Sequence, residues 1–318
     1  MESKMNFKLM SMAGQGGSVF GISLMEMMNH RSDLIVLSSD MSTPAGLDKF
    51  KAAFPDHFMN LGIAEQNMIG TAAGLAEEGF KPVCVAQACF ITMRSFEQIR
   101  QFCGYMQIPI VMVGIGSGVS LQYMGNTHYA IEDISLMRSV PGMQVTVPCD
   151  AYEAVKAFEY AVDCGHPVYL RLFGGTAIPA VFNEEEAFVG EKAIRLREGK
   201  DLQIIATGSM VGKALKVAEE FSSAGIDASV VDMHTIKPLD EEAIAFDTKL
   251  IVSLEEHSIV GGLGSAIADA LSRYTNHPRH IKLGFKDHFL PVGSYPYLLE
   301  QGGLSVDCIK KEIMNSLK

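Results

Sequence analysis

The sequence predicts an α/β protein with two domains, each built on a mostly parallel β-sheet. Short apolar runs rich in β-branched residues alternate with longer amphipathic stretches, which is the pattern of a parallel sheet covered by helices on both faces. The chain has 318 residues, enough for two domains of about 150 residues each. A segment rich in Gly, Pro and acidic residues at 174–199 interrupts the alternation, which then restarts.

The first domain is predicted to comprise residues 1–182. Its buried strands are expected at Leu34–Leu37, Val83–Ala86, Ile110–Val113, Met143–Val147 and Val168–Leu172. Apolar residues at helical spacing predict helices at Ser18–Asn29, Glu65–Glu78, Ser95–Tyr105, Ile131–Arg138 and Ala151–Cys164. Strand and helix therefore alternate through the whole domain.

The second domain is predicted to comprise residues 183–318, after an interdomain connection within 174–199. Its strands are expected at Leu202–Ala206, Ala228–Asp232 and Leu250–Leu254. Its helices are expected at Val211–Ala224, Gly264–Tyr274 and Val306–Leu317.

Composition excludes several classes of protein. Hydrophobic residues make up 48% of the chain and charged residues 20%, which is typical of a compact globular protein. The net charge of −11 argues against nucleic acid or an anionic membrane as a partner. The six cysteines form no CxxC pair, the N-terminus lacks the apolar core of a signal peptide, and no run approaches a membrane span. We therefore expect a cytoplasmic protein whose thiols pack as small hydrophobes.

The segment NLGIAEQNMIGTAAG places Glu65 where a strand-like run gives way to a helix rich in small residues. A carboxylate at a helix N-terminus is stabilised by the helix dipole, so Glu65 has an ordinary structural explanation. Its position alone does not indicate catalysis.

Two further segments carry aromatic, basic and histidine side chains. The first, ACFITMRSFEQIR, contains Phe90, Arg94 and Phe96, which in an arbitrary α/β protein would be core aromatics and a solvated arginine. The second, GIGSGVSLQYMGNTHYAIED, is a loop directly after a predicted strand, and loops at the carboxyl ends of parallel strands are where such folds bind ligands. His128 in this loop is a candidate for proton transfer, although a lone histidine is more often structural.

The order and spacing of these segments resemble the C-terminal half of transketolase. The first domain contains in order GIAEQNM, FEQIR, GNTHYAIEDISLMRSVPGMQVTVPCD and PVYLRL, and the second contains LQIIATGSMVGKAL, VVDMHTIKPLD and LIVSLEEHSIVGGLGSAIADAL. The resemblance covers essentially the whole chain and is nearest to the separately encoded C-terminal subunit of split transketolases. It implies a pyrimidine-binding α/β domain of the thiamine-diphosphate enzymes, followed by a transketolase C-terminal α/β domain.

The resemblance also implies roles for individual residues. In this family a glutamate binds a ring nitrogen of the cofactor's aminopyrimidine, and Glu65 matches this catalytic, cofactor-binding residue. Phe90 and Phe96 match aromatic residues against which the pyrimidine stacks, and Asp40 matches an aspartate near the cofactor. His128 matches the GxTH histidine that faces the reacting centre, where it would contact substrate and assist proton transfer.

The implied enzyme needs a second chain. Family members hold Mg²⁺ and the diphosphate through a GDG motif and a later Asn, and this sequence has no GDG, so we predict no metal ligand on it. The resemblance therefore implies an N-terminal transketolase subunit as partner, in a heterotetramer that moves a two-carbon ketol unit from a ketose to an aldose. For sugar binding it implies Arg94, which matches a family arginine near the substrate channel, and leaves Arg171 as a further candidate.

Three positions depart from the family pattern. An acidic pair often precedes the GxTH motif, and here Tyr123 and Met124 stand there. An arginine often follows the strand that ends YLRL, and here Phe173 and two glycines follow; an arginine expected near residues 12–15 is also absent. Each lost charge-assisted contact typically costs about 1.5–3 kcal/mol of binding, so we expect a shifted substrate, such as a modified ketose.

Three alternatives share this fold. A 1-deoxyxylulose-5-phosphate synthase is normally one longer chain with an aspartate at the position of Met124. A 2-oxoacid dehydrogenase β-subunit has the same two domains. A non-catalytic binding subunit would have kept the fold and lost the chemistry, which the joint presence of Glu65, Phe90 and His128 argues against.

Overall fold

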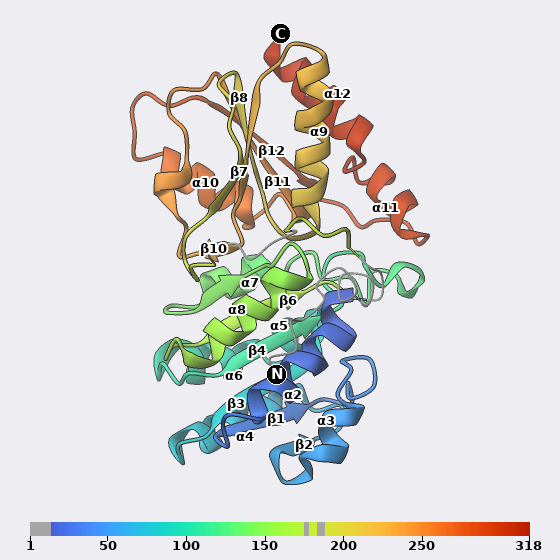
Figure 1. Ribbon diagram of the computed structural model, residues 1–318, viewed down its shortest axis with the longest axis vertical. Coiled ribbons are helices and arrows are strands. Elements are labelled where there is room, and N and C mark those ends of the chain that lie inside the picture. The colour runs from blue at the N-terminus through green and yellow to red at the C-terminus, as the bar shows by residue number, and fades with distance from the viewer. Residues whose placement is uncertain (1–13, 175–177, 183–187) are drawn as a thin grey trace.

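The computed structural model describes residues 14–174, 178–182 and 188–318. It contains the two predicted α/β domains, one above the other in Figure 1, with the first in blue to green and the second in yellow to red. The predicted boundary between residues 182 and 183 borders a segment outside the described residues, so its exact position stays a prediction.

The first domain alternates strands and helices as the sequence predicted. Its strands are β1 (Leu34–Ser38), β2 (Phe58–Asn60), β3 (Lys81–Gln87), β4 (Val111–Ile115), β5 (Gln144–Thr146) and β6 (Val168–Leu172). Its helices are α2 (Phe20–Met28), α3 (Asp48–Ala53), α4 (Glu65–Glu77), α5 (Ala88–Met93), α6 (Phe96–Ile99), α7 (Asp133–Ser139) and α8 (Ala151–Asp163). The sequence missed the short elements β2, α3 and α5, and the helix expected at Ser95–Tyr105 is α6 followed by a π-helical turn at Arg100–Tyr105.

Both faces of the first sheet are covered, which explains its continuous apolar strands. In β1, Leu34 and Val36 pack with Phe20 and Leu24 of α2 on one face. Ile35 and Leu37 of the same strand join a second cluster, which includes residues of α4, on the other face. Because neighbouring side chains point to opposite faces, a strand buried on both sides has to be apolar throughout.

The second domain has its own sheet, in the order β12-β11-β8-β9-β7. Its strands are β7 (Ile194–Arg197), β8 (Leu202–Ala206), β9 (Ala228–Asp232), β11 (Leu250–Ser258) and β12 (Arg279–Phe285). Its helices are α9 (Val211–Ser223), α10 (Leu263–Leu271), α11 (Tyr295–Gln301) and α12 (Val306–Leu317). Strand β7 lies within the segment predicted as a connection and pairs antiparallel with β9, while the other strands of this sheet run parallel.

One strand from the second half of the chain joins the sheet of the first domain, which the sequence did not predict. Strand β10 (Thr235–Lys237) follows β9 in the chain but pairs antiparallel with β5 of the first domain. It forms the edge of a seven-stranded sheet in the order β10-β5-β6-β4-β3-β1-β2. The connection from β9 to β10 therefore ties the second domain to the first.

Burial agrees with the sequence in two respects. All six cysteines are free, and Cys84, Cys89, Cys103 and Cys149 are buried, as expected for thiols that pack as hydrophobes. In the described part of the chain, no helix has the length and apolarity needed to cross a membrane.

Candidate active site

A cavity of about 430 Å³ opens at the carboxyl ends of the central strands of the first sheet. Strands β4, β3 and β1 are neighbours in this sheet, so the loops that follow them meet at one edge. The cavity is lined by Ser39, Asp40, Met41, Ile63, Glu65, Gln87, Phe90, Arg94, Thr127 and His128. Five of the seven site residues predicted from the sequence are therefore brought together here.

Glu65 is the first residue of α4, as the sequence predicted, and is only 4% exposed. The buried face of α4, which includes Met68, Ile69 and Ala72, packs into the core and fixes the helix start. The helix N-terminus favours the negative charge of the Glu65 carboxylate. Its charged partner is Arg94, whose Nη1 lies 3.1 Å from Oε1 and 3.3 Å from Oε2.

Phe90 forms a wall of the cavity from helix α5. The guanidinium carbon of Arg94 lies 3.6 Å from the centroid of the Phe90 ring, which is a close cation–π contact. The ring of His128 meets Phe90 edge to face, with centroids 5.4 Å apart and an interplanar angle of 64°. The half-buried Phe90 ring thus contacts both a cation and an imidazole.

His128 lies on the long loop between β4 and α7 (residues 116–132). Contacts from both domains fix this loop. Its Nδ1 is 2.8 Å from the hydroxyl of Thr127. The neighbouring Asn126 exchanges two hydrogen bonds with Leu290 of the second domain, donating through Nδ2 (2.7 Å) and accepting from the Leu290 N–H (3.2 Å). The second domain therefore positions the loop that carries the histidine.

Asp40 follows β1 with a left-handed backbone, at φ of 55°. Such a conformation is unfavourable for a residue other than glycine and occurs often at functional sites. The Asp40 N–H donates to the side-chain oxygen of Asn60 at 3.1 Å, which holds the turn at the rim of the cavity.

Two predicted site residues lie elsewhere. Phe96 is half-buried and packs against the core of the first domain. Arg171 in β6 is 4% exposed; its Nε donates to Asp133 at 2.7 Å, and its Nη2 donates to the carbonyls of Ala130 and Glu256 at 2.9 and 3.1 Å. Neither residue lines the cavity, and Arg171 instead connects the long loop to the second domain.

The departures from the family pattern have visible consequences. Tyr123 is 71% exposed and Met124 is 52% exposed, on a short turn of the same loop as His128. A side chain at Gly174 would place its Cβ 2.8 Å from the backbone nitrogen and Cα of Gly116, so this position has no room for an arginine. Residue 175 and the start of the 12–15 segment lie outside the described residues.

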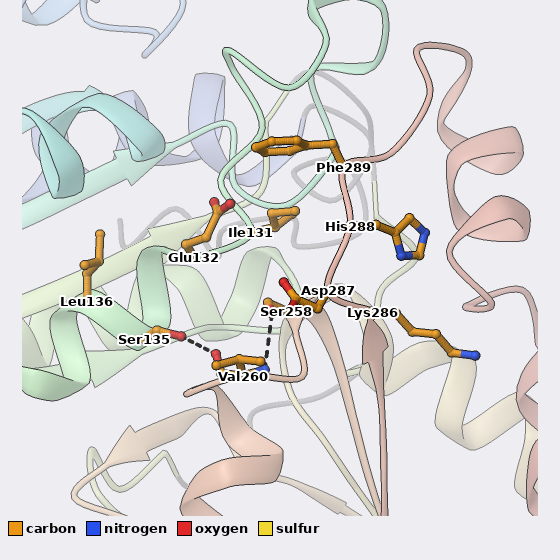
Figure 2. Close-up of a pocket in the computed structure, with 10 residues that line it drawn as sticks. All are labelled: Ile131, Glu132, Ser135, Leu136, Ser258, Val260, Lys286, Asp287, His288 and Phe289. Atoms are coloured by element: carbon orange, nitrogen blue, oxygen red, sulfur yellow. Dashed lines mark hydrogen bonds between the residues drawn. The ribbon is translucent and has the colours of Figure 1, made fainter.

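A second cavity of about 600 Å³ lies between the long loop and the segment 286–289 of the second domain. Figure 2 shows Glu132, Ser258, Asp287 and Phe289 around it, and burial raises the pKa of Glu132. None of these residues was predicted from the sequence to be functional. We place the candidate active site in the smaller cavity, because Glu65, Arg94 and His128 converge there.

Taken together, the fold and the cavity define a two-domain α/β protein with a carboxylate, an aromatic face and a histidine at the strand ends of its first domain. The family model "Transketolase, pyrimidine binding domain" matches residues 16–173, and the model "Transketolase, C-terminal domain" matches residues 191–309. The chain belongs to the transketolase family, in which it corresponds to the C-terminal portion that split transketolases carry as a separate chain.

Similar proteins cover nearly the whole chain. A putative transketolase C-terminal section from Methanocaldococcus jannaschii is 36% identical over 94% of this chain and 95% of that protein. The 6-deoxy-6-sulfo-D-fructose transketolase subunit SqwH from Clostridium sp. (strain MSTE9) is 37% identical, over 92% of this chain and 90% of that subunit.

One solved structure, a split-gene transketolase described as an inactive β4 tetramer, superposes with a TM-score of 0.84 at 37% identity and covers 94% of this chain and 97% of that chain. A 1-deoxy-D-xylulose-5-phosphate synthase from Caldanaerobacter subterraneus subsp. tengcongensis is 32% identical over 94% of this chain, but this covers only 48% of the synthase. The match to one half of a longer enzyme agrees with the two-domain organisation of the chain.

Proposed function

We propose that the chain is the aminopyrimidine-binding subunit of a thiamine-diphosphate-dependent transketolase that transfers a two-carbon ketol unit from a ketose to an aldose. The observation that carries the proposal is the convergence of buried Glu65, the Phe90 ring and His128 in one cavity at the strand ends. Each group suits a different part of this chemistry, and family membership supplies the context.

The cavity fits the aminopyrimidine end of the cofactor. Glu65 offers a buried carboxylate to a ring nitrogen, and Phe90 offers a half-buried aromatic face on which a flat ring can stack. When bound, thiamine diphosphate supplies the carbon nucleophile that cleaves and forms the C–C bond of a ketose. Asp40 lies at the rim of the same cavity and is proposed as a further cofactor contact.

His128 and Arg94 are proposed to handle the sugar. The Nδ1 of His128 is engaged by Thr127, so its Nε2 remains to give or take a proton at a substrate hydroxyl. Arg94 is 44% exposed and carries a charge that can bind a sugar phosphate or another anionic group. Arg171 enters the proposal only as a buried support of the loop that carries His128.

The diphosphate and its Mg²⁺ are proposed to bind a partner chain, the N-terminal transketolase subunit with a GDG motif. The cavity contains two carboxylates, Asp40 and Glu65, and one of them already pairs with Arg94. This arrangement suits a ring nitrogen better than a second set of anions. We propose a heterotetramer of two chains of each kind, in accord with the relatives that are named as sections or subunits.

The donor is proposed to be a modified ketose. The exposed Tyr123 and Met124 present an apolar edge where family members often have an acidic pair, and Gly174 excludes an arginine at the end of β6. A relative of 37% identity is named for a sulfo-sugar, 6-deoxy-6-sulfo-D-fructose. These observations favour a substrate that differs from an ordinary ketose phosphate at the groups that those charges would contact.

A second candidate is a subunit with 1-deoxyxylulose-5-phosphate synthase activity, which the 32% identity to such an enzyme favours. The two reactions differ in their product, because such a synthase forms 1-deoxyxylulose 5-phosphate, whereas the proposed transketolase passes a two-carbon ketol unit to an aldose. Product analysis therefore separates them directly.

The test is co-expression with a GDG-containing transketolase N-terminal subunit, followed by calorimetric titration of the complex with thiamine diphosphate and Mg²⁺. We expect the wild-type complex to bind the cofactor and to consume a ketose, and Glu65→Gln to lose turnover while the complex still assembles. Glu77→Gln, at the exposed end of the same helix, is the matched control. Absence of cofactor binding, or full turnover in Glu65→Gln, would refute the proposal, and formation of 1-deoxyxylulose 5-phosphate would favour the synthase.

A further inference from the structure

Arg94 occupies the two surfaces that the proposed function gives to the aminopyrimidine. Its guanidinium carbon lies 3.6 Å from the Phe90 ring centroid, and its Nη1 lies 3.1 and 3.3 Å from the two oxygens of Glu65. A guanidinium is flat, carries N–H donors at its edge and stacks on aromatic rings. An aminopyrimidine protonated at a ring nitrogen shares all three properties. The guanidinium of Arg94 can therefore make the same contacts with Glu65 and Phe90 as the aminopyrimidine ring would make.

We propose that Arg94 is a built-in occupant of the aminopyrimidine site, which the cofactor displaces when it binds; this inference rests on the proposed function. In the empty subunit the arginine neutralises Glu65 and covers Phe90. The cofactor then exchanges one flat cation for another, and the arginine is released toward the substrate side of the cavity. The contacts of Arg94 with Glu65 and Phe90 must break before the cofactor binds, so they lower the affinity of the subunit for the cofactor.

The two partners of this contact differ in their freedom to move. Glu65 is 4% exposed and is fixed at the start of α4, whereas the Arg94 side chain is 44% exposed. The backbone of Arg94 is anchored separately, because its carbonyl accepts a hydrogen bond from Gln66 Nε2 at 2.9 Å. The side chain can therefore leave without disturbing the chain around it. A buried carboxylate left without any partner would be costly, which explains why the site holds a cation when the cofactor is absent.

A static role for Arg94 predicts the opposite effect of removing it. If the arginine stayed beside Glu65 and supported the bound ring, its loss would weaken cofactor binding. If it occupies the site, its loss removes a competitor and strengthens binding. The sign of the change in cofactor affinity therefore separates the two roles.

The experiment compares wild type, Arg94→Gln, Arg94→Lys and Arg100→Gln in complex with the GDG-containing subunit. Equilibrium affinity for thiamine diphosphate with Mg²⁺ is measured by calorimetry, and the association rate by stopped flow. Arg100 is the matched control, because it is an exposed arginine that lines a different cavity, with Tyr105 and Pro141. Thermal melting confirms that each variant is folded.

We expect Arg94→Gln to bind the cofactor about tenfold more tightly and to associate faster, since one charge-assisted contact and one stacked contact no longer compete. Arg94→Lys, which keeps the charge but not the flat fork, should fall between Arg94→Gln and wild type. Unchanged or weaker binding in Arg94→Gln, with normal binding in wild type, would overturn this inference alone. Failure of the wild-type complex to bind the cofactor would overturn it together with the proposed function.

Discussion

Replacing Asp232 by Asn should make the protein more stable at neutral and alkaline pH and change its stability little near pH 4. Asp232 ends β9 in the second domain and faces Glu153 of α8 and Cys149 of the first domain. The Cys149 sulfur and one carboxylate oxygen from each of Glu153 and Asp232 lie within 4.8 Å of one another. All three residues are at most 1% exposed. Both oxygens of Asp232 and Oε1 of Glu153 have no hydrogen-bond partner among the described residues.

The two carboxyl groups retain a proton at neutral pH. Burial raises the pKa of Asp232 to about 7 and raises the pKa of Glu153 well above its usual range, and the adjacent Asp232 carboxylate adds to the rise at Glu153. The nearby carboxylate of Asp150 acts in the same direction, while its own oxygens accept hydrogen bonds from the N–H groups of Glu153, Val181 and Phe182. A neutral Glu153 can donate to one oxygen of Asp232, and the Cys149 thiol to the other. The retained proton then forms a hydrogen bond between Glu153 of the first domain and Asp232 of the second.

This proton makes stability depend on pH. Between about pH 4 and pH 7 the native state binds more protons at this site than the unfolded chain, so the free energy of unfolding falls as pH rises. For Asp232, a folded pKa of about 7 against an ordinary value of 3.8 corresponds to about 4 kcal/mol, lost in full above pH 7. The asparagine amide that replaces this carboxyl group cannot ionise, and it can donate to Glu153 and accept from the thiol of Cys149. The variant should therefore avoid this loss.

The assay is urea unfolding from about pH 4 to pH 9, with Asp247→Asn on the exposed surface as the control. The curves of wild type and Asp232→Asn should meet near pH 4, separate as pH rises to about 7, and keep a constant separation above that pH. Curves that keep a constant separation between about pH 4 and pH 7 would contradict this expectation. So would a stoichiometric divalent metal in the purified protein that is lost in Cys149→Ser, because a cation would then hold the carboxylates in place of a proton.

Three further predictions concern packing and specificity. Asp133→Asn should lower the free energy of unfolding by about 3–5 kcal/mol in urea, because it removes the buried charge that pairs with Arg171 at 2.7 Å, whereas exposed Asp269→Asn should have little effect. Gly114→Ala should cost about 1–3 kcal/mol, since its Cβ would lie 2.6 Å from the hydroxyl oxygen of Tyr169; an unchanged unfolding midpoint would contradict this. Met124→Asp should raise kcat/KM for ordinary ketose phosphates about tenfold or more. No gain in a donor screen would show that Met124 does not determine donor specificity.

Much of the fold followed from local pattern. The strand β6 and the start of α4 were predicted to the residue, because runs of β-branched residues and the change to helical spacing are local signals. The short strand β10 could not be predicted in this way. It has three residues and pairs with β5, about ninety positions earlier in the chain, so only the tertiary fold provides its partner.

The sequence by itself determined the family and the residues that the proposed chemistry needs, because Glu65, Phe90 and His128 stand in ordered segments whose spacing is specific. The tertiary structure decided which predicted residues meet. It places Arg94 on Phe90 and Glu65, and it buries Arg171 against Asp133. Two arginines look alike in a sequence. Their burial and partners depend on which face of the sheet or helix each one occupies, and long-range packing fixes that face.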